Sequence, residues 1–142
     1  MIFILFARFL LGAGPIGMYS AFQLFMAGME VTIVNDRPER YMRNRVIFLD
    51  PKWMTHLRFF LGTEFDEFFI GENSTADLNP GDVGLVCGRH LERVMKFRLS
   101  DLVSYVHYVS GADSKSKDLK LEFMFETSFE DVKYPNKAGR NL

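Results

Sequence analysis

The 142-residue chain has the size of one domain, with 48% hydrophobic residues and a formal net charge of −1 from 17 basic and 18 acidic side chains. This balance argues against nucleic acid or an anionic membrane as its main partner. The single cysteine, Cys87, excludes an internal disulfide framework and a cysteine-rich metal site. The three histidines lie far apart in the sequence, so we expect no metal site. A chain with one cysteine suits a reducing compartment, so we expect a cytoplasmic protein.

The start of the chain is strongly apolar, and we interpret residues 3–11 as a buried strand. Arg8 interrupts the run and Gly12 ends it, which leaves it far shorter than the roughly 20 residues of a membrane-spanning helix. A secretory signal would need a basic segment ahead of the apolar run, and only Met1 stands there. The start therefore predicts a strand rather than a targeting segment.

A helix and a second strand are predicted directly after this strand. Residues 18–27 contain no glycine or proline and include good helix formers, with Gly28 placed to end the helix. Apolar side chains occupy most of its circumference, so we expect this helix to be covered on more than one side. Residues 30–35 are rich in β-branched side chains and predict the second strand. Residues 3–36 thus predict one right-handed βαβ unit with two parallel strands.

The rest of the chain predicts a mixture of helices, loops and a late strand. We expect a single α/β domain over residues 1–142, Rossmann-like but incomplete, with a partial parallel sheet. The expected segments are, in chain order, a charged connector at 37–45, a short apolar run at 46–49, a helix at 53–61, a packed amphipathic turn at 65–69, a loop at 71–84, one long or two short helices at 90–108, a strand or hairpin at 119–132 and a flexible tail at 133–142.

The turn Gly12-Ala13-Gly14-Pro15-Ile16-Gly17 has the spacing of a dinucleotide-binding loop. Gly12 permits the tight turn, Gly14 lets a pyrophosphate approach the backbone, and Gly17 lets the helix pack closely on the sheet. Free N–H groups at the start of the helix would bind the phosphates without a basic side chain. We predict that Gly12, Gly14, Pro15, Ile16 and Gly17 hold the cofactor; the alternative is a tight turn that binds no ligand.

The end of the second strand is the expected place of a carboxylate that accepts hydrogen bonds from the ribose hydroxyls. Asn35 stands at that position, and Asp36 follows it. An asparagine carries no charge and donates as well as accepts, which predicts weaker ribose binding. Asp36 takes over if the strand ends one residue later. We predict that Asn35 or Asp36 contacts the ribose, although the segment also suits an ordinary turn.

Four arginines lie in the connector that follows, at positions 37, 40, 43 and 45. Guanidinium groups beside a phosphate-binding turn can pair with a pyrophosphate through two hydrogen bonds at once. A run of charge of this kind also suits a connector that is simply solvated. The residues alone leave both readings open.

The glycine turn and the helix after it resemble the extended FAD fingerprint of the glutathione-reductase-like flavoproteins. The matching positions are Gly12, Gly14, Gly17, Ala21, Leu24, Gly28 and Val31. Within these proteins the chain is most similar to the class A flavin monooxygenases, and its segments 43–51 and 55–58 resemble the MICAL-type monooxygenase domain. The resemblance implies a Rossmann fold, FAD as cofactor and NAD(P)H as electron donor.

The resemblance also implies site residues, and the chain departs from it in two places. It places Arg37 and Arg43 near the FAD, and it suggests either Arg89 or Arg98 as a further arginine at the start of a later helix. The family has Glu where this chain has Asn35, and the later Gly-Asp motif that closes over the FAD is absent after the predicted third strand. We therefore expect that the residues enclosing the flavin ring are missing.

The residues and the resemblance together predict the FAD-binding portion of a flavin-dependent oxidoreductase, a monooxygenase that is inactive as this chain alone. Two alternatives stay open: an NAD(P)-binding Rossmann domain, and a nucleotide-free remnant that acts as an interaction module. Besides FAD, we expect as partner either a missing C-terminal segment or a second copy of the chain. An incomplete sheet should also leave at least one of Phe22, Phe25 and Met26 exposed.

Overall fold

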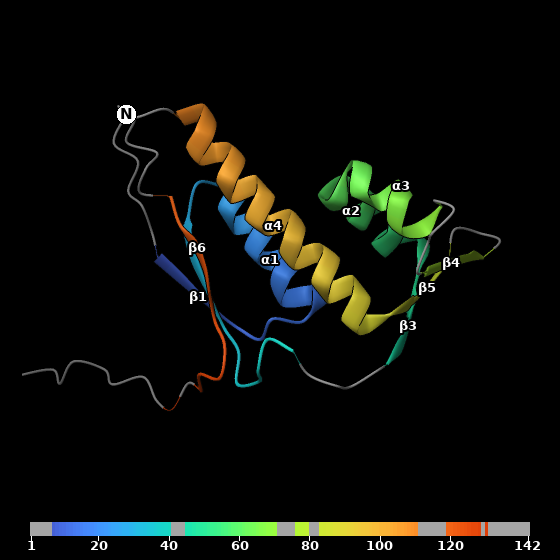
Figure 1. Cartoon of the computed structure of the whole chain (residues 1–142), viewed down its shortest axis with the longest axis horizontal. Helices are drawn as coiled ribbons and strands as arrows, with labels where there is room; N and C mark the ends of the chain where they lie inside the picture. The colour runs from blue at the N-terminus through green and yellow to red at the C-terminus, as the bar shows by residue number, and fades with distance from the viewer. Residues whose placement is uncertain are drawn as a thin grey trace, which may run out of the picture.

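The computed structural model describes residues 7–40, 45–70, 76–79, 83–110, 119–128 and 130. It forms two small sheets with helices packed between and beside them (Figure 1). The elements are, in chain order, β1 (Ala7–Leu11), α1 (Pro15–Met26), β2 (Glu30–Val34), β3 (Val46–Leu49), α2 (Pro51–Leu61), α3 (Thr63–Phe69), β4 (Ala76–Asn79), β5 (Val83–Cys87), α4 (Gly88–Ser110) and β6 (Leu121–Met124).

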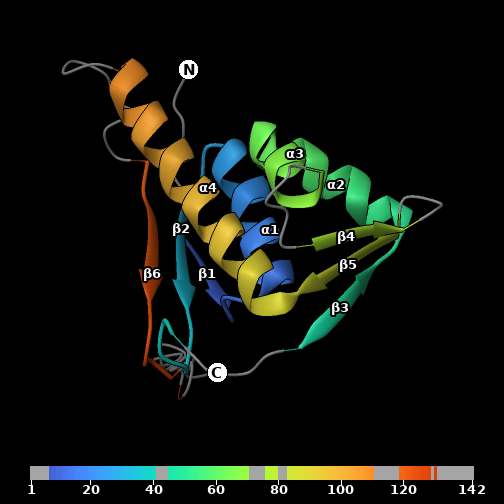
Figure 2. The same cartoon turned by 45° about the vertical axis from the view of Figure 1, so that its right-hand side comes forward.

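The first sheet is parallel and has the strand order β1-β2-β6. Leu10 of β1 pairs in register with Ile33 of β2, which in turn pairs with Phe123 of β6. The crossover from β1 to β2 contains α1, and the connection from β2 to β6 contains α4; both helices lie on the same side of the sheet (Figure 2). This arrangement confirms the predicted βαβ unit, the parallel strand pair and the α/β fold class.

The second sheet is antiparallel, with the order β3-β5-β4, and it corrects the sequence analysis. We predicted a loop over residues 71–84, yet 76–79 and the first residues of β5 pair as neighbouring strands. Turn-forming residues around two short strands hid them in the sequence. Gly84 explains part of this arrangement: a Cβ there would lie 2.6 Å from the Met54 sulfur, so β5 packs close against α2.

The helices differ from the predictions mainly at their ends. α1 begins three residues earlier than expected, because Pro15 is suited to the first helical position. α2 begins at Pro51, and the Asp50 side chain caps it by accepting a hydrogen bond from the Trp53 N–H at 2.9 Å. The packed turn predicted at 65–69 is the helix α3, and residues 90–108 belong to the single long helix α4.

The late strand is also simpler than the two options left open for residues 119–132. Its described part contains the single strand β6, which pairs in parallel with β2. Residues 3–6 of the first predicted strand, Arg43 and the predicted tail at 133–142 lie outside the described residues.

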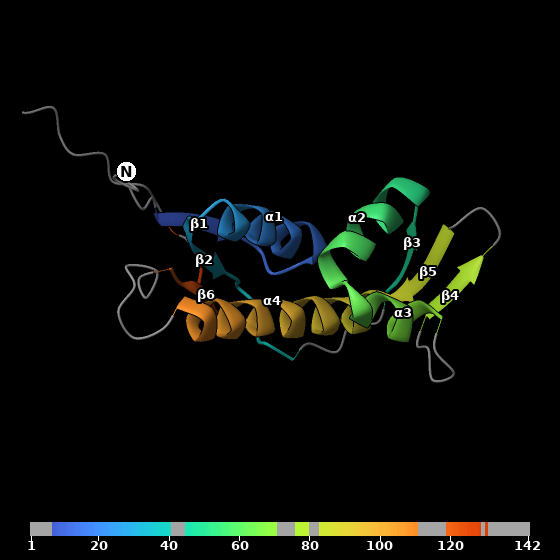
Figure 3. The ribbon, with the colours of Figure 1, turned by 90° about the horizontal axis from the view of Figure 1, so that it is seen from above.

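The hydrophobic core lies where α1, α2 and α4 meet the two sheets. α1 and α4 run side by side, and α2 and α3 pack beside them over the second sheet (Figure 3). Phe22 and Phe60 belong to this core, and their ring centroids are 4.7 Å apart. Met26 is exposed whereas Phe22 and Phe25 are buried, as the prediction of at least one exposed side chain requires. None of the described helices combines the length and apolarity needed to cross a bilayer.

Candidate functional site

The glycine turn lies at the carboxyl end of β1, beside the end of β2. Gly12 adopts a φ of 105°, which favours glycine, and its N–H donates to the Val34 carbonyl at 2.7 Å. A Cβ on Gly17 would overlap the Gly12 carbonyl oxygen, so packing itself requires glycine at position 17. Gly14 differs: a Cβ there would meet no atom of the described residues within 4 Å. The packing of the described residues therefore does not explain why position 14 is a glycine.

The N-terminus of α1 opens onto this space. Gly14 is the N-cap, and within α1 and its flanking described residues no side chain caps the helix and no acidic side chain occupies the first turn. The unpaired N–H groups of a first helical turn attract anions. A cavity of about 260 Å³ lies here, lined by Gly12, Ala13, Gly14, Asn35, Asp36, Arg37 and Glu92. Pro15 is the first helical residue and Ile16 is exposed, and neither lines this cavity in the structure.

Asn35 connects the end of β2 to the glycine turn. Its Oδ1 accepts a hydrogen bond from the Ala13 N–H at 3.3 Å, and its Nδ2 donates to the Arg37 carbonyl at 3.3 Å. Asn35 is half-buried, whereas Asp36 and Arg37 are exposed and face each other at 4.0 Å. The structure thus brings the predicted residues Asn35, Asp36 and Arg37 together around the cavity, and it gives Asn35 a role in fixing the turn.

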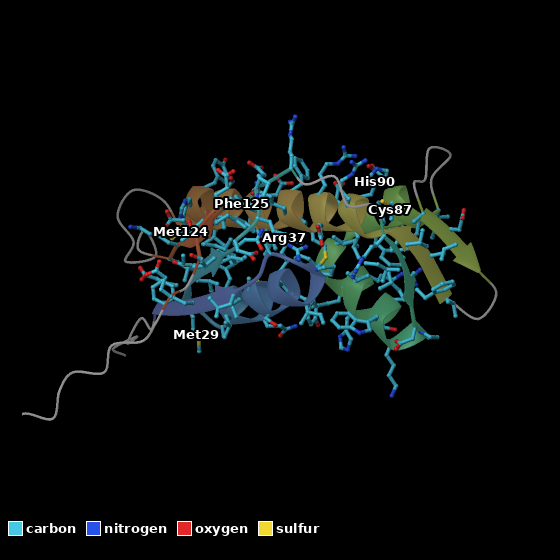
Figure 4. All side chains as sticks on the ribbon, turned by 90° about the horizontal axis from the view of Figure 1, so that it is seen from below. Met29, Arg37, Cys87, His90, Met124 and Phe125 are labelled. Carbon is cyan, nitrogen blue, oxygen red and sulfur yellow. The ribbon has the colours of Figure 1, made fainter. Side chains whose placement is uncertain are left out.

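A second, larger cavity of about 540 Å³ continues from the first one. It lies between the connector after β2, the first turns of α4 and the segment around β6, and Figure 4 shows this side of the molecule with Arg37, His90 and Phe125 labelled. Its size falls in the range of small-molecule sites. Its lining residues are Ala13, Asn35, Pro38, Glu39, Arg40, Arg89, His90, Glu92, Arg93, Lys96, Phe123 and Phe125.

The larger cavity carries more positive than negative side chains. Four basic residues line it, against the two acids Glu39 and Glu92. Lys96 pairs with Glu39, and its hydrogen bond and charge hold the pKa of the Glu39 carboxyl below its usual value. The Lys96 ammonium also lies 4.7 Å from the centroid of the Phe125 ring. The excess of positive charge favours an anionic ligand in this cavity.

The contribution of α4 to the site was only partly visible in the sequence. Arg89, Glu92, Arg93 and Lys96 all line the larger cavity, and their spacing of three and four residues places them on one face of a helix. That spacing was a usable signal, but only tertiary packing brings this face to the glycine turn. The sequence leaves open whether Arg89 or Arg98 is the further arginine near the cofactor. In the structure Arg89 lines the larger cavity, whereas Arg98 donates to the Phe60 carbonyl at 3.4 Å.

The three histidines lie apart from one another in the structure and make different contacts. The ring of His56 shares a hydrogen bond of 3.0 Å with the Tyr19 hydroxyl, and His107 contacts the Leu119 carbonyl at 3.1 Å. The buried Nδ1 of His90 has no hydrogen-bond partner among the described residues, and His90 lines the larger cavity. Within the described ranges no three His, Cys, Asp or Glu side chains gather as metal ligands do.

Comparisons with known proteins detect a likeness of fold. No protein-family model and no curated protein sequence matches the chain. The Diels-Alderase PyrE3 of the pyrroindomycin pathway matches 92% of this chain and 27% of its own chain, with a TM-score of 0.59 and 14% identity. The p-nitrophenol 4-monooxygenase PnpA from Pseudomonas putida DLL-E4 matches 87% of this chain and 32% of its own, with a TM-score of 0.53 and 14% identity.

A third solved structure is the flavin-dependent monooxygenase PieE in complex with FAD and substrate. It matches 86% of this chain and 24% of its own, with a TM-score of 0.54 and 14% identity. The chain thus spans about a quarter to a third of the length of these three proteins. At such identity the likeness concerns the fold: the chain shares the α/β fold of the parts of these proteins that it matches, with βαβ units and a parallel sheet of three strands.

Proposed function

We propose that this chain binds the ADP part of FAD and forms the FAD-binding portion of a flavin-dependent oxidoreductase. The observation that supports this most directly is Gly14, at the N-terminus of α1 and beside the 260 Å³ cavity, because no contact among the described residues explains a glycine there and no described side chain caps the helix. A pyrophosphate can approach the backbone there only because position 14 has no side chain, and the free N–H groups of the first helical turn can then bind it. The positive excess in the adjoining cavity suits the same ligand.

The wider activity is proposed as monooxygenation with NAD(P)H as electron donor. FAD supplies the two-electron chemistry when bound, and the chain's own residues would bind and orient it. The likeness to PieE and PnpA supports this proposal, and the likeness to the Diels-Alderase PyrE3 shows that the fold alone does not fix the reaction. The closer resemblance to MICAL-type domains rests on residues 43–51 and 55–58, part of which forms β3 and the start of α2.

The first test is binding by the purified chain. We expect flavin absorption in the visible range after incubation with FAD and gel filtration, and heat of binding in calorimetry with FAD and with ADP. Gly14→Glu should abolish both signals, because the new carboxylate would occupy the pyrophosphate position with a like charge. The control is Glu122→Gln, which should keep binding, because Glu122 is exposed on the face of the parallel sheet that points away from α1 and α4.

The two other functions make different predictions in the same experiment. An NAD(P)-binding domain would bind NAD⁺ or NADP⁺ and ADP but show no preference for FAD. A nucleotide-free interaction module would bind none of these ligands, and the hydrogen bonds of Asn35 to the Ala13 N–H and the Arg37 carbonyl are compatible with it. Binding of FAD that Gly14→Glu leaves unchanged would place the ligand elsewhere and contradict the proposal.

A further inference from the structure

The two cavities share an acidic side chain that the glycine fingerprint does not contain. Glu92 lies in the second turn of α4, is half-buried, and lines both the 260 Å³ and the 540 Å³ cavity. The other residues around the smaller cavity all come from the glycine turn and the end of β2. Among the described residues, Glu92 is therefore the one through which α4 reaches the smaller cavity.

The ribose of a bound nucleotide requires a strong acceptor near the end of β2. Asn35 occupies the usual chain position, but it is neutral, its Oδ1 accepts from the Ala13 N–H, and its Nδ2 donates to the Arg37 carbonyl. Asn35 and Glu92 line the same two cavities. A carboxylate on α4 can thus reach the space that a carboxylate on β2 would otherwise serve.

We propose that Glu92 supplies the ribose-binding carboxylate of this chain, in place of the uncharged Asn35. This inference rests on the proposed binding of an adenine nucleotide. A carboxylate accepts hydrogen bonds from the ribose hydroxyls more strongly than an amide does. It also repels a phosphate on the 2′ position, so Glu92 selects ADP and FAD against nucleotides of the NADP type.

The surrounding charges make a carboxylate tolerable beside a pyrophosphate. Arg89 and Arg93 flank Glu92 on the same helix face, and both line the larger cavity without an ion pair among the described residues. With Arg40 and Lys96 they keep the cavity positive despite Glu92 and Glu39. The acid therefore serves selectivity at the sugar, while the basic residues serve attraction of the phosphates.

The test compares ADP, 2′,3′-dideoxy-ADP and 2′-phospho-ADP by calorimetry on the full chain. The unchanged protein should bind ADP at least about 10-fold more tightly than either analogue, because a hydrogen bond to a charged acceptor is lost or a like charge is added. Glu92→Gln and Glu92→Ala should both remove most of this preference. Asp101→Asn, an exposed position of the same helix outside the cavities, should keep it.

A second change tests the idea of replacement directly. Asn35→Asp in the Glu92→Gln background should restore the preference for ADP over the dideoxy analogue, since aspartate keeps an acceptor for the Ala13 N–H. Circular dichroism shows that each variant is folded. A preference for ADP that survives in both Glu92 variants, or tighter binding of 2′-phospho-ADP by the unchanged chain, would overturn this inference alone. Absence of ADP binding by the unchanged chain would overturn the proposed function as well.

Discussion

At the scale of single residues, the glycines of the turn serve different purposes, and two matched substitutions separate them. Gly17→Ala should lower the free energy of unfolding by about 1–3 kcal/mol, because the added Cβ meets the Gly12 carbonyl oxygen, which is backbone and cannot turn away. Gly14→Ala should change stability by less than about 0.5 kcal/mol, since its φ of −76° suits alanine and the space is open. Urea unfolding measures both. A Gly17→Ala protein as stable as the unchanged chain would show that the turn is looser than described.

The ion pair between Lys96 and Glu39 connects α4 to the segment after β2, and it predicts how the Glu39 carboxyl titrates. The pKa of the Glu39 carboxyl is lowered in the folded chain, first by the hydrogen bond from Lys96 and then by its charge. The pair therefore contributes above the ordinary carboxyl pKa and is lost as the pH falls through the lowered pKa. Lys96→Met should raise the pKa of Glu39 towards its ordinary value, as followed by NMR of the side-chain carboxyl.

The control for this titration is Arg40→Gln, because Arg40 makes the smallest contribution to the lowered pKa of Glu39. It should raise that pKa less than Lys96→Met does. A Glu39 carboxyl that titrates alike in the unchanged protein and in Lys96→Met would show that the pair does not form in solution.

At the scale of elements, α2 depends on its N-cap. Asp50 accepts from the Trp53 N–H at 2.9 Å, and Pro51 stands at the first helical position. Asp50→Ala should lower the free energy of unfolding by about 0.5–2 kcal/mol, the usual cost of losing such a cap. Asp101→Ala, at an exposed interior position of α4, should have a smaller effect. Thermal or urea unfolding with equal losses in both variants would argue against the cap.

The elements that the sequence predicts well are those governed by short-range rules. The path from β1 through the glycine turn and α1 to β2 follows from apolar runs, glycines and β-branched residues that lie close together in the chain. The hairpin of β4 and β5 was missed, because each strand is short and its stability comes from pairing and from the close packing of Gly84 against Met54. Glu92 was missed for the same reason, since only the folding of α4 against α1 brings it to the glycine turn.

At the scale of the whole molecule, the two sides of the parallel sheet differ. α1 and α4 cover one side, where Val31 and Ile33 are buried (Figures 1 and 2). On the other side no described helix covers the sheet, and Phe9, Leu11 and Met124 remain exposed there. From the sequence we expected exposed apolar side chains on α1, and of the three named there only Met26 is exposed, whereas Phe22 and Phe25 are buried. The sheet, in contrast, exposes Phe9, Leu11 and Met124.

This uncovered sheet face predicts that the isolated chain associates with a second copy of itself. Phe9 and Leu11 are 67% and 64% exposed on alternate positions of β1, and Met124 of β6 lies in register with Leu11 on the far side of Val34 of β2. Exposed apolar side chains on one face of a sheet favour burial on contact. Phe9→Thr should shift the sedimentation coefficient towards that of a monomer at the same concentration, because threonine keeps the strand preference and removes most of the apolar area. Phe48→Thr is the matched control: Phe48 is 74% exposed on β3 of the other sheet, and its loss should leave the association unchanged. Sedimentation at two concentrations decides between them, and a chain that is monomeric throughout, or one dissociated by Phe48→Thr instead, would contradict this prediction.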